Sequence, residues 1–323
     1  MRYRILGRTG LNVSEIGYGA WGISGRQWIG AEDAVSLKAL ATARAAGVNF
    51  YDTALAYGDG HSEQILARAF GRDPAVIIAS KVPPKNSIWP AAPHSRLPDV
   101  FPRAYVLDCL ERSLRNLGRE TVDLYQFHVW NDEWASQDEW QSTVEEIRHS
   151  GKARFLGISI NDHQPYNVLK ALGTGLIDCT QVIYNIFDQS PEDELFPYCR
   201  EHNIGVIARV PFDEGALTGR ITPETKFPAG DFREQYFGGR RKELVWDRVQ
   251  RISQELHVTA EQMPEIALRF CLTPPAVGTV IPGMRTPAHV QHNAAASDRG
   301  PLPAAALAKL RPYRWEKNFY AED

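Results

Sequence analysis

Short apolar runs alternate with longer amphipathic stretches over almost the whole chain. The apolar runs are rich in Val, Ile, Tyr and Phe and are bounded by Gly, Pro or charged residues, a pattern that predicts buried strands. Eight such runs are expected as strands, at residues 17–22, 48–52, 75–79, 122–127, 153–160, 179–184, 204–210 and 277–281.

The stretches between these runs carry apolar residues at helical spacing. In residues 103–117, for example, Val106, Leu110, Leu114 and Leu117 follow the period, and Gly118 ends the pattern. Helices are expected at residues 31–46, 62–70, 103–117, 137–149, 163–172, 191–202, 244–256, 259–272, 286–297 and 301–314. Strands and helices alternate about eight times, which favours a closed (β/α)8 TIM barrel over an open, doubly wound sheet.

Segments at the two ends add to this barrel. Residues 3–6 and 13–16 are expected as a β-hairpin around the turn at residues 7–10, and residues 301–314 as an extra C-terminal helix. The whole chain, residues 1–323, is expected to form a single domain, because this length is usual for one α/β barrel.

Two long stretches do not fit either pattern. Residues 82–102 contain six prolines, which disfavour helix and central strand, and residues 211–243 are rich in Gly and Pro. A long irregular loop in a compact barrel is usually functional, so residues 82–102 are expected to lean over the pocket and to select the substrate. The alternative is an insertion without a function.

The composition excludes several classes of protein. The net charge of −3 gives no reason to expect nucleic-acid binding, and the sequence has neither a signal-peptide pattern nor an apolar run long enough for a membrane span. The four cysteines are far apart, which argues against a zinc site or a redox pair and favours reduced, buried thiols. A cytoplasmic protein without a metal site is therefore expected.

Polar residues stand at the ends of three consecutive predicted strands. Asp52 ends one strand, with Tyr57 on the loop after it, Lys81 follows the next, and His128 follows the third. The carboxyl ends of barrel strands face one pocket, so these four side chains are expected to meet. An ammonium group near a phenol lowers its pKa, so Lys81, held by Asp52, would prepare Tyr57 as a general acid. Each residue alone also has an ordinary structural explanation.

This set resembles the catalytic tetrad of the aldo-keto reductase superfamily. The resemblance extends over nearly the whole chain, through segments that occur in the family's order: residues 8–22, 49–58, 123–128, 151–159, 181–185 and 281–293. It implies reduction of an aldehyde or ketone by hydride transfer from NADPH, with NADH a weaker candidate, and a hairpin that plugs the bottom of the barrel. The match Gly17-x-Gly19-x-x-Gly22 is not interpreted as a Rossmann motif, because its Tyr and Trp would crowd a pyrophosphate turn.

The resemblance also assigns cofactor contacts. Ser159 and Gln181 would bind the nicotinamide carboxamide, and Asn161 would replace an Asn that relatives carry one position earlier, where this chain has Ile160. Arg209 stands where relatives have an aromatic residue that stacks on the nicotinamide. Either its guanidinium stacks there and disfavours the oxidised cofactor, or it turns away to an ion pair with Asp213 or Glu214.

Further residues are implied for the phosphates and the substrate. A pyrophosphate-covering loop would use Pro211, Gly215, Leu217, Gly219 and Arg220, and the adenosine end would use Gly283, Arg285, His289 and Asn293. Arg285 at a helix N-terminus is expected to bind a 2′-phosphate. The predicted pocket walls are Trp21, which would also touch the cofactor, together with Trp89, Trp130 and Tyr236.

Two other functions remain open at this stage. Regulatory subunits of potassium channels also resemble aldo-keto reductases, and a sugar dehydrogenase or epimerase can share the fold. The expected ligand is a small carbonyl compound or sugar, whose identity the sequence does not determine, and neither does it determine the oligomeric state.

Overall fold

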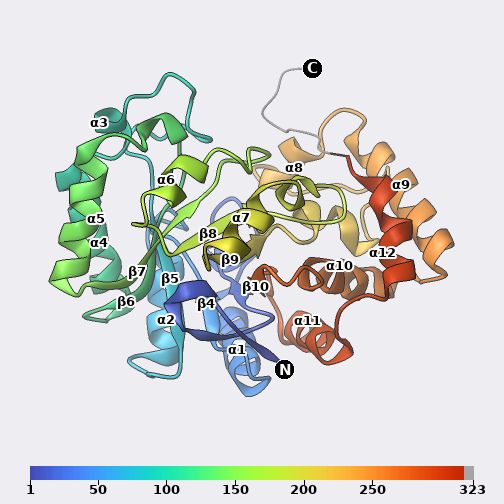
Figure 1. Ribbon diagram of the computed structural model, residues 1–323. Helices are drawn as coiled ribbons and strands as arrows, with labels where there is room; N and C mark the ends of the chain where they lie inside the picture. The colour runs from blue at the N-terminus through green and yellow to red at the C-terminus, as the bar shows by residue number, and fades with distance from the viewer. Residues whose placement is uncertain (316–323) are drawn as a thin grey trace.

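The computed structural model describes residues 1–315, and within them eight parallel strands form the central sheet (Figure 1). Neighbouring strands in the sheet are also neighbours in the sequence, in the order β3 to β10. Their bounds are β3 (Tyr18–Gly19), β4 (Phe50–Asp52), β5 (Ile77–Val82), β6 (Val122–Phe127), β7 (Ala153–Ser159), β8 (Cys179–Ile183), β9 (Gly205–Arg209) and β10 (Val277–Val280).

Backbone hydrogen bonds join the two ends of this sheet. The Gly17 N–H donates to the Val280 carbonyl at 2.8 Å, and the Gly19 N–H donates to the Pro282 carbonyl at 3.0 Å. Parallel bridges pair Ile16 with Val280 and Gly19 with Gly283. The strands therefore close into the predicted (β/α)8 barrel, which leaves no exposed sheet edge.

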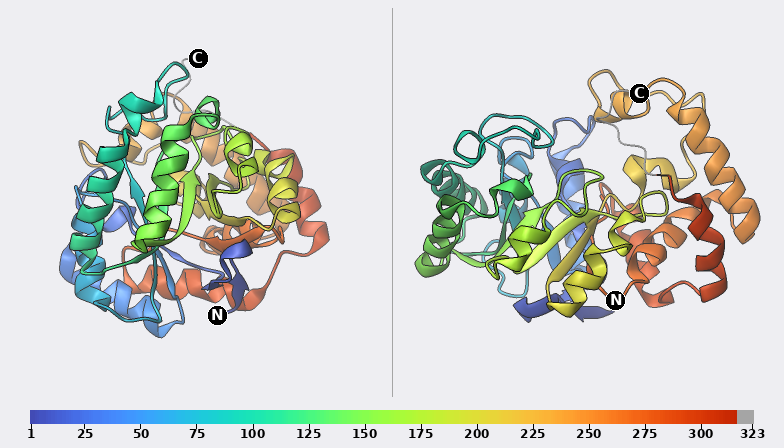
Figure 2. Two further views of the ribbon diagram at one scale, coloured as in Figure 1. Left: turned by 60° about the vertical axis from the view of Figure 1, so that its left-hand side comes forward. Right: turned by 45° about the horizontal axis from the view of Figure 1, so that its top comes forward.

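Helices surround the barrel on all sides (Figure 2). They are α1 (Asp33–Ala45), α2 (His61–Phe70), α3 (Leu97–Val100), α4 (Arg103–Leu117), α5 (Asp138–Ser150), α6 (Leu169–Gly173), α7 (Leu195–Glu201), α8 (Phe232–Tyr236), α9 (Arg241–Leu256), α10 (Met263–Leu272), α11 (Pro287–Arg299) and α12 (Ala304–Leu310). Short 3₁₀ turns are η1 (Gly7–Thr9), η2 (Trp21–Ile23), η3 (Asp132–Trp134), η4 (Ser190–Glu192), η5 (Asp213–Thr218), η6 (Ala260–Gln262) and η7 (Arg311–Tyr313).

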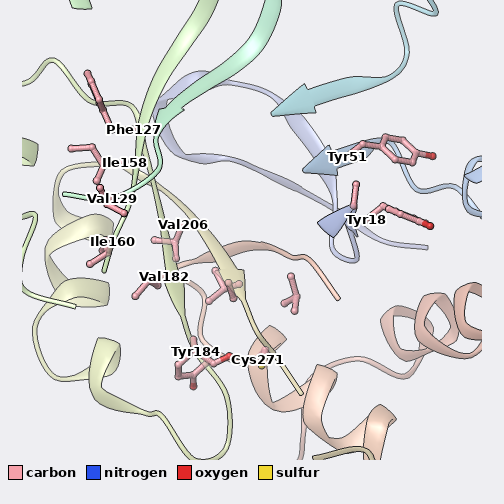
Figure 3. Close-up of a cluster of buried hydrophobic side chains, with 14 of the residues drawn as sticks. Tyr18, Tyr51, Phe127, Val129, Ile158, Ile160, Val182, Tyr184, Val206 and Cys271 are labelled. Atoms are coloured by element: carbon pink, nitrogen blue, oxygen red, sulfur yellow. Dashed lines mark hydrogen bonds between the residues drawn. The ribbon is translucent and has the colours of Figure 1, made fainter. Parts of the chain in front are cut away.

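Apolar side chains form two cores. The larger core lies between the strands and the surrounding helices, and Figure 3 shows part of it, with Tyr184 beside Cys271. The smaller core fills the barrel interior, where Phe50, Leu124 and Ile207 point inward from their strands. All four cysteines are buried free thiols, as the sequence predicts.

The N-terminal hairpin closes one end of the barrel, as expected. Its strands β1 (Tyr3–Ile5) and β2 (Asn12–Ser14) pair antiparallel. Leu6, Leu11 and Val13 belong to the interior core together with the strand residues. The hairpin lies at the bottom of Figure 1, while α3 and α8 lie at the top, beyond the carboxyl ends of the strands.

Local chemistry shortened some predicted elements. The predicted helix at residues 163–172 is reduced to α6, because His163 has a φ of 56° and Pro165 lacks a backbone N–H. The predicted strand at residues 17–22 ends at Gly19 and continues into η2. In the proline-rich loop, α3 adds one helical turn, which Pro98 tolerates because it stands in the first turn.

Residues 1–315 contain neither a helix that could span a membrane nor a cluster of metal-binding side chains. None of the helices in residues 1–315 combines the length and the apolar character that a membrane span requires. The same residues contain no cluster of three His, Cys, Asp or Glu side chains arranged to hold a metal ion.

Candidate active site

A cavity of about 1140 Å³ opens at the carboxyl ends of the strands. Residues from β4, β7, β8 and β9 line it, together with the loops after β5, β6 and β10. Its volume is slightly above the usual range for ligand pockets, roughly 300–1,000 Å³. One cavity therefore runs from the predicted catalytic residues to the N-terminus of α11.

Asp52 is the central acceptor of a buried network of hydrogen bonds at the floor of this cavity. Lys81 is completely buried, and its Nζ donates to Asp52 Oδ1 at 2.6 Å and to the Thr53 carbonyl at 2.7 Å. The other oxygen of Asp52 accepts a hydrogen bond from Gln181 Nε2 at 2.7 Å. The buried ammonium is thus paired and hydrogen-bonded, which is what a buried charge requires.

Tyr57 lies above this network. Lys81 Nζ is 5.0 Å from the centre of the Tyr57 ring, so the predicted neighbours do meet. The predicted direction of the pKa shift is wrong, however. Burial and the negative charge of Asp52 raise the pKa of Tyr57, and burial lowers the pKa of Lys81. In this structure Tyr57 is therefore a neutral phenol that carries its proton.

His128 completes the predicted group of four. Its ring contacts Tyr57 edge-on, with 5.5 Å between the ring centres, and it contacts Trp89 at 4.6 Å. Burial, then the positive charges of Lys81 and Arg209, hold the pKa of His128 well below its usual value. The imidazole is therefore neutral, and its buried Nδ1 has no hydrogen-bond partner within residues 1–315.

Aromatic side chains form the walls above the catalytic residues. Trp21 stacks against Tyr57 with 6.1 Å between the ring centres, and both Trp21 and Trp89 line the cavity. Trp130 and Tyr236 do not line it. Trp130 is fully buried between Phe127, Trp134 and Trp140. The reason is that an indole with enough apolar neighbours packs into the core instead of facing the cavity.

The ends of β7, β8 and β9 line the next part of the cavity. Ser159 and Gln181 are register partners on β7 and β8. Asn161 also lines the cavity, but its side chain bonds to the backbone of Ala91 and Trp130 and so joins two loops. To contact a cofactor, the Asn161 side chain would have to break one of these hydrogen bonds and form another with the cofactor.

Arg209 forms an ion pair that neither sequence alternative named. Its Nη2 donates to Asp162 Oδ1 at 2.6 Å and to the Ile160 carbonyl at 2.9 Å. Arg209 also lines the cavity. The expected partner Asp213 instead accepts hydrogen bonds from Tyr236 at 2.6 Å and from Arg241 at 2.9 Å.

The segment after β9 has a strained backbone. Val210, Asp213 and Glu214 have φ values of 55°, 46° and 55°, a region that non-glycine residues enter rarely and β-branched residues almost never. Pro211, Gly215 and Arg220 line the cavity, whereas the predicted phosphate contacts Leu217 and Gly219 do not. An added Cβ on Gly215 would meet nothing within 4 Å, so its backbone borders open space.

Basic groups gather at the far end of the cavity, beside the N-terminus of α11. Gly283, Arg285, His289 and Asn293, which the sequence assigns to the adenosine end of the cofactor, all line it. Burial, then the positive charges of Arg220 and Arg285, lower the pKa of His289. A helix N-terminus that is surrounded by positive charge attracts anions. The residues present therefore fit a dinucleotide, with amide and hydroxyl groups at one end and an anion site at the other.

Two segments that the sequence did not mark for the site, the loop before α1 and the N-terminal end of α8, complete the cavity. The Phe232 N–H donates to the Gln27 carbonyl at 2.7 Å, and the Ile29 N–H donates to Asp231 Oδ2 at 3.2 Å. Both segments line the cavity, with Gln27, Trp28, Phe232 and Arg233. The sequence signal for them was weak, because it consists of aromatic residues scattered through irregular segments.

A family model describes this chain over residues 15–312, and the model is that of the Aldo/keto reductase family. The chain belongs to this family. This family consists of oxidoreductases that use nicotinamide cofactors. In this chain the family's fold occurs together with the group of Asp52, Tyr57, Lys81 and His128 beside the cavity.

The names of individual relatives state different functions. The chain is 27% identical to the NADH-specific methylglyoxal reductase of Escherichia coli, over 90% of this chain and 92% of the relative. It is also 27% identical to a probable voltage-gated potassium channel subunit beta of Oryza sativa, over 94% and 93%. The solved structure of aldo-keto reductase AKR11C1 from Bacillus halodurans (holo form) is similar, with a TM-score of 0.78, 27% identity and coverage of 98% and 97%.

Proposed function

We propose that this protein reduces an aldehyde or ketone to the alcohol with NADPH, and that Tyr57 is the proton donor. The observation that carries the proposal is the meeting of Asp52, Tyr57, Lys81 and His128 at one end of a cavity whose other end is basic. A nicotinamide cofactor, when bound, supplies the hydride.

Tyr57 carries the proton that the acid step requires, because its raised pKa keeps the phenol neutral. The same shift makes Tyr57 a weaker acid, so the step needs a group that stabilises the phenolate. As negative charge develops on the carbonyl oxygen, the phenol transfers its proton to that oxygen. The phenolate that remains is stabilised by Lys81, which the bond to Asp52 holds in place. His128 is neutral and orients the carbonyl oxygen through a hydrogen bond.

The cofactor contacts follow the chemistry of the lining residues. Ser159 and the amide oxygen of Gln181 are proposed to bind the carboxamide, and Asn293 the adenine. Arg285 and His289 are proposed to bind the 2′-phosphate, which is why NADPH is preferred over NADH in this proposal.

The first test follows NADPH oxidation by absorbance with a panel of aldehydes, ketones and sugars, for the parent and Tyr57→Phe. We expect the parent to turn over and kcat of Tyr57→Phe to fall by roughly 10²–10⁴-fold, because general-acid catalysis contributes about that much. The Kd for NADPH, measured by fluorescence, should change less than about twofold. A variant that keeps its kcat would contradict the role of Tyr57.

A second candidate function is a cofactor-binding regulatory subunit, which is favoured by the similarity to a probable potassium channel subunit beta. This function predicts that the parent binds NADPH tightly but turns over none of the panel. Turnover of a sugar in the oxidising direction alone would instead favour a sugar dehydrogenase on the same fold.

A further inference from the structure

Glu214 is a carboxyl group at the cavity wall for which the proposed reaction has no use. It lines the cavity between Arg209 and Gly215. Within residues 1–315 its carboxyl group makes no hydrogen bond and no ion pair, whereas the adjacent Asp213 is fully engaged by Tyr236 and Arg241. A half-buried carboxyl group without a partner loses hydration that nothing in the protein replaces.

The backbone holds Glu214 in this place at a cost. Its φ of 55° lies in the left-handed region, where a non-glycine residue stores strain. Such strain persists where the surrounding structure enforces it, and it is concentrated at ligand sites. The Phe212 carbonyl accepts hydrogen bonds from Gly215 at 3.0 Å and Leu217 at 2.9 Å, which fixes the turn.

The surroundings of Glu214 decide which ligand chemistry fits. Asp213 and Asp162 supply negative charge, and Arg209 and Arg233 supply positive charge. An ammonium ligand would be repelled by Arg209, and a phosphate would be repelled by the carboxylates. A neutral hydroxyl group avoids both penalties, because it donates to a carboxylate and also pairs with a protonated carboxyl group.

We propose that Glu214 binds a hydroxyl group of the ligand, either of a ribose in the cofactor or of a hydroxylated carbonyl substrate. The location supports this, because Glu214 lines the same cavity as Tyr57 and His128 and so borders the space that the ligand would occupy. Burial, then Asp213 and Asp162, raises the pKa of Glu214 to about 8, so hydroxyl binding is possible in either protonation state near neutral pH. The inference rests on the proposed function.

The experiment compares the parent with Glu214→Gln and Glu214→Leu, and uses Glu224→Gln, an exposed carboxylate of the same segment, as the control. The Kd values for NADPH and NADH are measured by fluorescence without substrate. Then kcat/KM is measured for D-glyceraldehyde and for 2-methylbutyraldehyde, in which methyl groups replace both hydroxyl groups. Circular dichroism checks that each variant is folded.

Two results would support the proposal, and they distinguish a hydroxyl group of the ribose from one of the substrate. If the hydroxyl group is that of the ribose, Glu214→Leu raises both Kd values about tenfold or more. If it belongs to the substrate, the Kd values stay constant, and the preference for D-glyceraldehyde over 2-methylbutyraldehyde falls about tenfold. Variants that match the parent within twofold in both measurements, or that bind NADPH more tightly with the substrate preference unchanged, overturn the proposal. If the parent itself binds neither NADPH nor NADH, the proposed function fails first.

Discussion

At the residue scale, charge pairing separates the acidic side chains of the site into two kinds. Asp52, Asp162 and Asp213 each have a cationic partner, in Lys81, Arg209 and Arg241 respectively. Glu214 has no such partner within residues 1–315. The paired carboxylates hold neighbouring side chains in place. The Glu214 carboxyl group, in contrast, remains available to exchange a proton and to bind a ligand.

The raised pKa of Glu214 predicts a dependence of stability on pH. The unfolded chain releases this proton near the usual pKa of about 4.3, but the folded protein releases it near 8. Between these values the folded state binds more protons, so stability falls as the pH rises. The facing groups are Asp213, Asp162, Arg209 and Arg233, and they are present in both proteins to be compared.

The measurement is urea unfolding of the parent and of Glu214→Gln at pH 5 and pH 8.5. The free energy of unfolding of the parent, relative to Glu214→Gln, should fall by about 1–2 kcal/mol between these pH values, after allowance for solvent screening. An equal difference between the two proteins at both pH values would refute the shift.

The basic end of the cavity predicts cofactor selectivity. Arg285→Ala should raise the Kd for NADPH by about tenfold or more and change the Kd for NADH by less than about threefold, because a charged hydrogen bond to the 2′-phosphate is lost. The matched control is Arg299→Ala, an exposed arginine at the other end of α11. Equal losses for both cofactors would assign Arg285 to a structural role, through its bond to the Ile29 carbonyl at 2.9 Å.

At the element scale, regular periodicity made the fold predictable. The sequence predicts α4 at the observed bounds, Arg103–Leu117, because four apolar residues at helical spacing and a terminal Gly118 all agree. The same reasoning failed at residues 163–168, where the positive φ of His163 and the missing N–H of Pro165 replace the helix by turns. Asp52, Tyr57, Lys81 and His128 were predictable because strand ends converge in a barrel.

Other parts of the site were not predictable, for physical reasons. Trp130 was assigned to the wall, but its indole packs against Phe127, Trp134 and Trp140, and the order of these aromatic residues in the sequence does not show which of them face the cavity. The pairing of Arg209 with Asp162 joins the last residue of β9 to the loop after β7, and no local pattern encodes such a contact. The direction of the Tyr57 pKa shift depends on how far burial outweighs a nearby ammonium group, which only the three-dimensional arrangement determines.

The hairpin element predicts a loss of stability without a loss of chemistry. Leu6 is fully buried in the interior core. Leu6→Ala should lower the free energy of unfolding by about 2–5 kcal/mol, because a cavity remains in the barrel. Denaturant unfolding measures this, with the partly exposed Leu244→Ala as the control. The kcat per folded molecule should stay constant; a lower kcat would mean that the hairpin supports the catalytic end as well.

At the scale of the whole molecule, the barrel separates stability from chemistry. The hairpin closes one end, the interior core fills the barrel between the ends, and the cavity opens at the other end. Because the packing at the hairpin end does not depend on the loops around the cavity, these loops can differ without loss of the fold. One barrel can therefore support many reactions. The loop at residues 24–30 and the N-terminal end of α8 contact each other beside the cavity, so segments that are far apart in the chain border it together.

Contact between these two segments predicts an effect on cofactor release. Asp231 accepts a hydrogen bond from the Ile29 N–H and also pairs with Arg233, whose guanidinium lies 4.4 Å from the centre of the Trp28 ring. Asp231→Ala should raise the dissociation rate of NADPH about fivefold or more in stopped-flow fluorescence, because the segments separate more easily. Glu234→Ala, on the same helix, is the control. An unchanged rate would show that the two segments do not limit release.

The position of the hairpin also has a consequence for biosynthesis. Arg4 Nη1 donates to the Val277 carbonyl at 2.9 Å across a sequence separation of 273 residues, so the hairpin docks on one of the last strands to be made. At a translation rate of about 5–20 residues per second, Leu6, Leu11 and Val13 wait roughly 15–55 s on the ribosome for their partners. The nascent chain exposes these apolar side chains throughout that time, and barrel closure is a late event of synthesis.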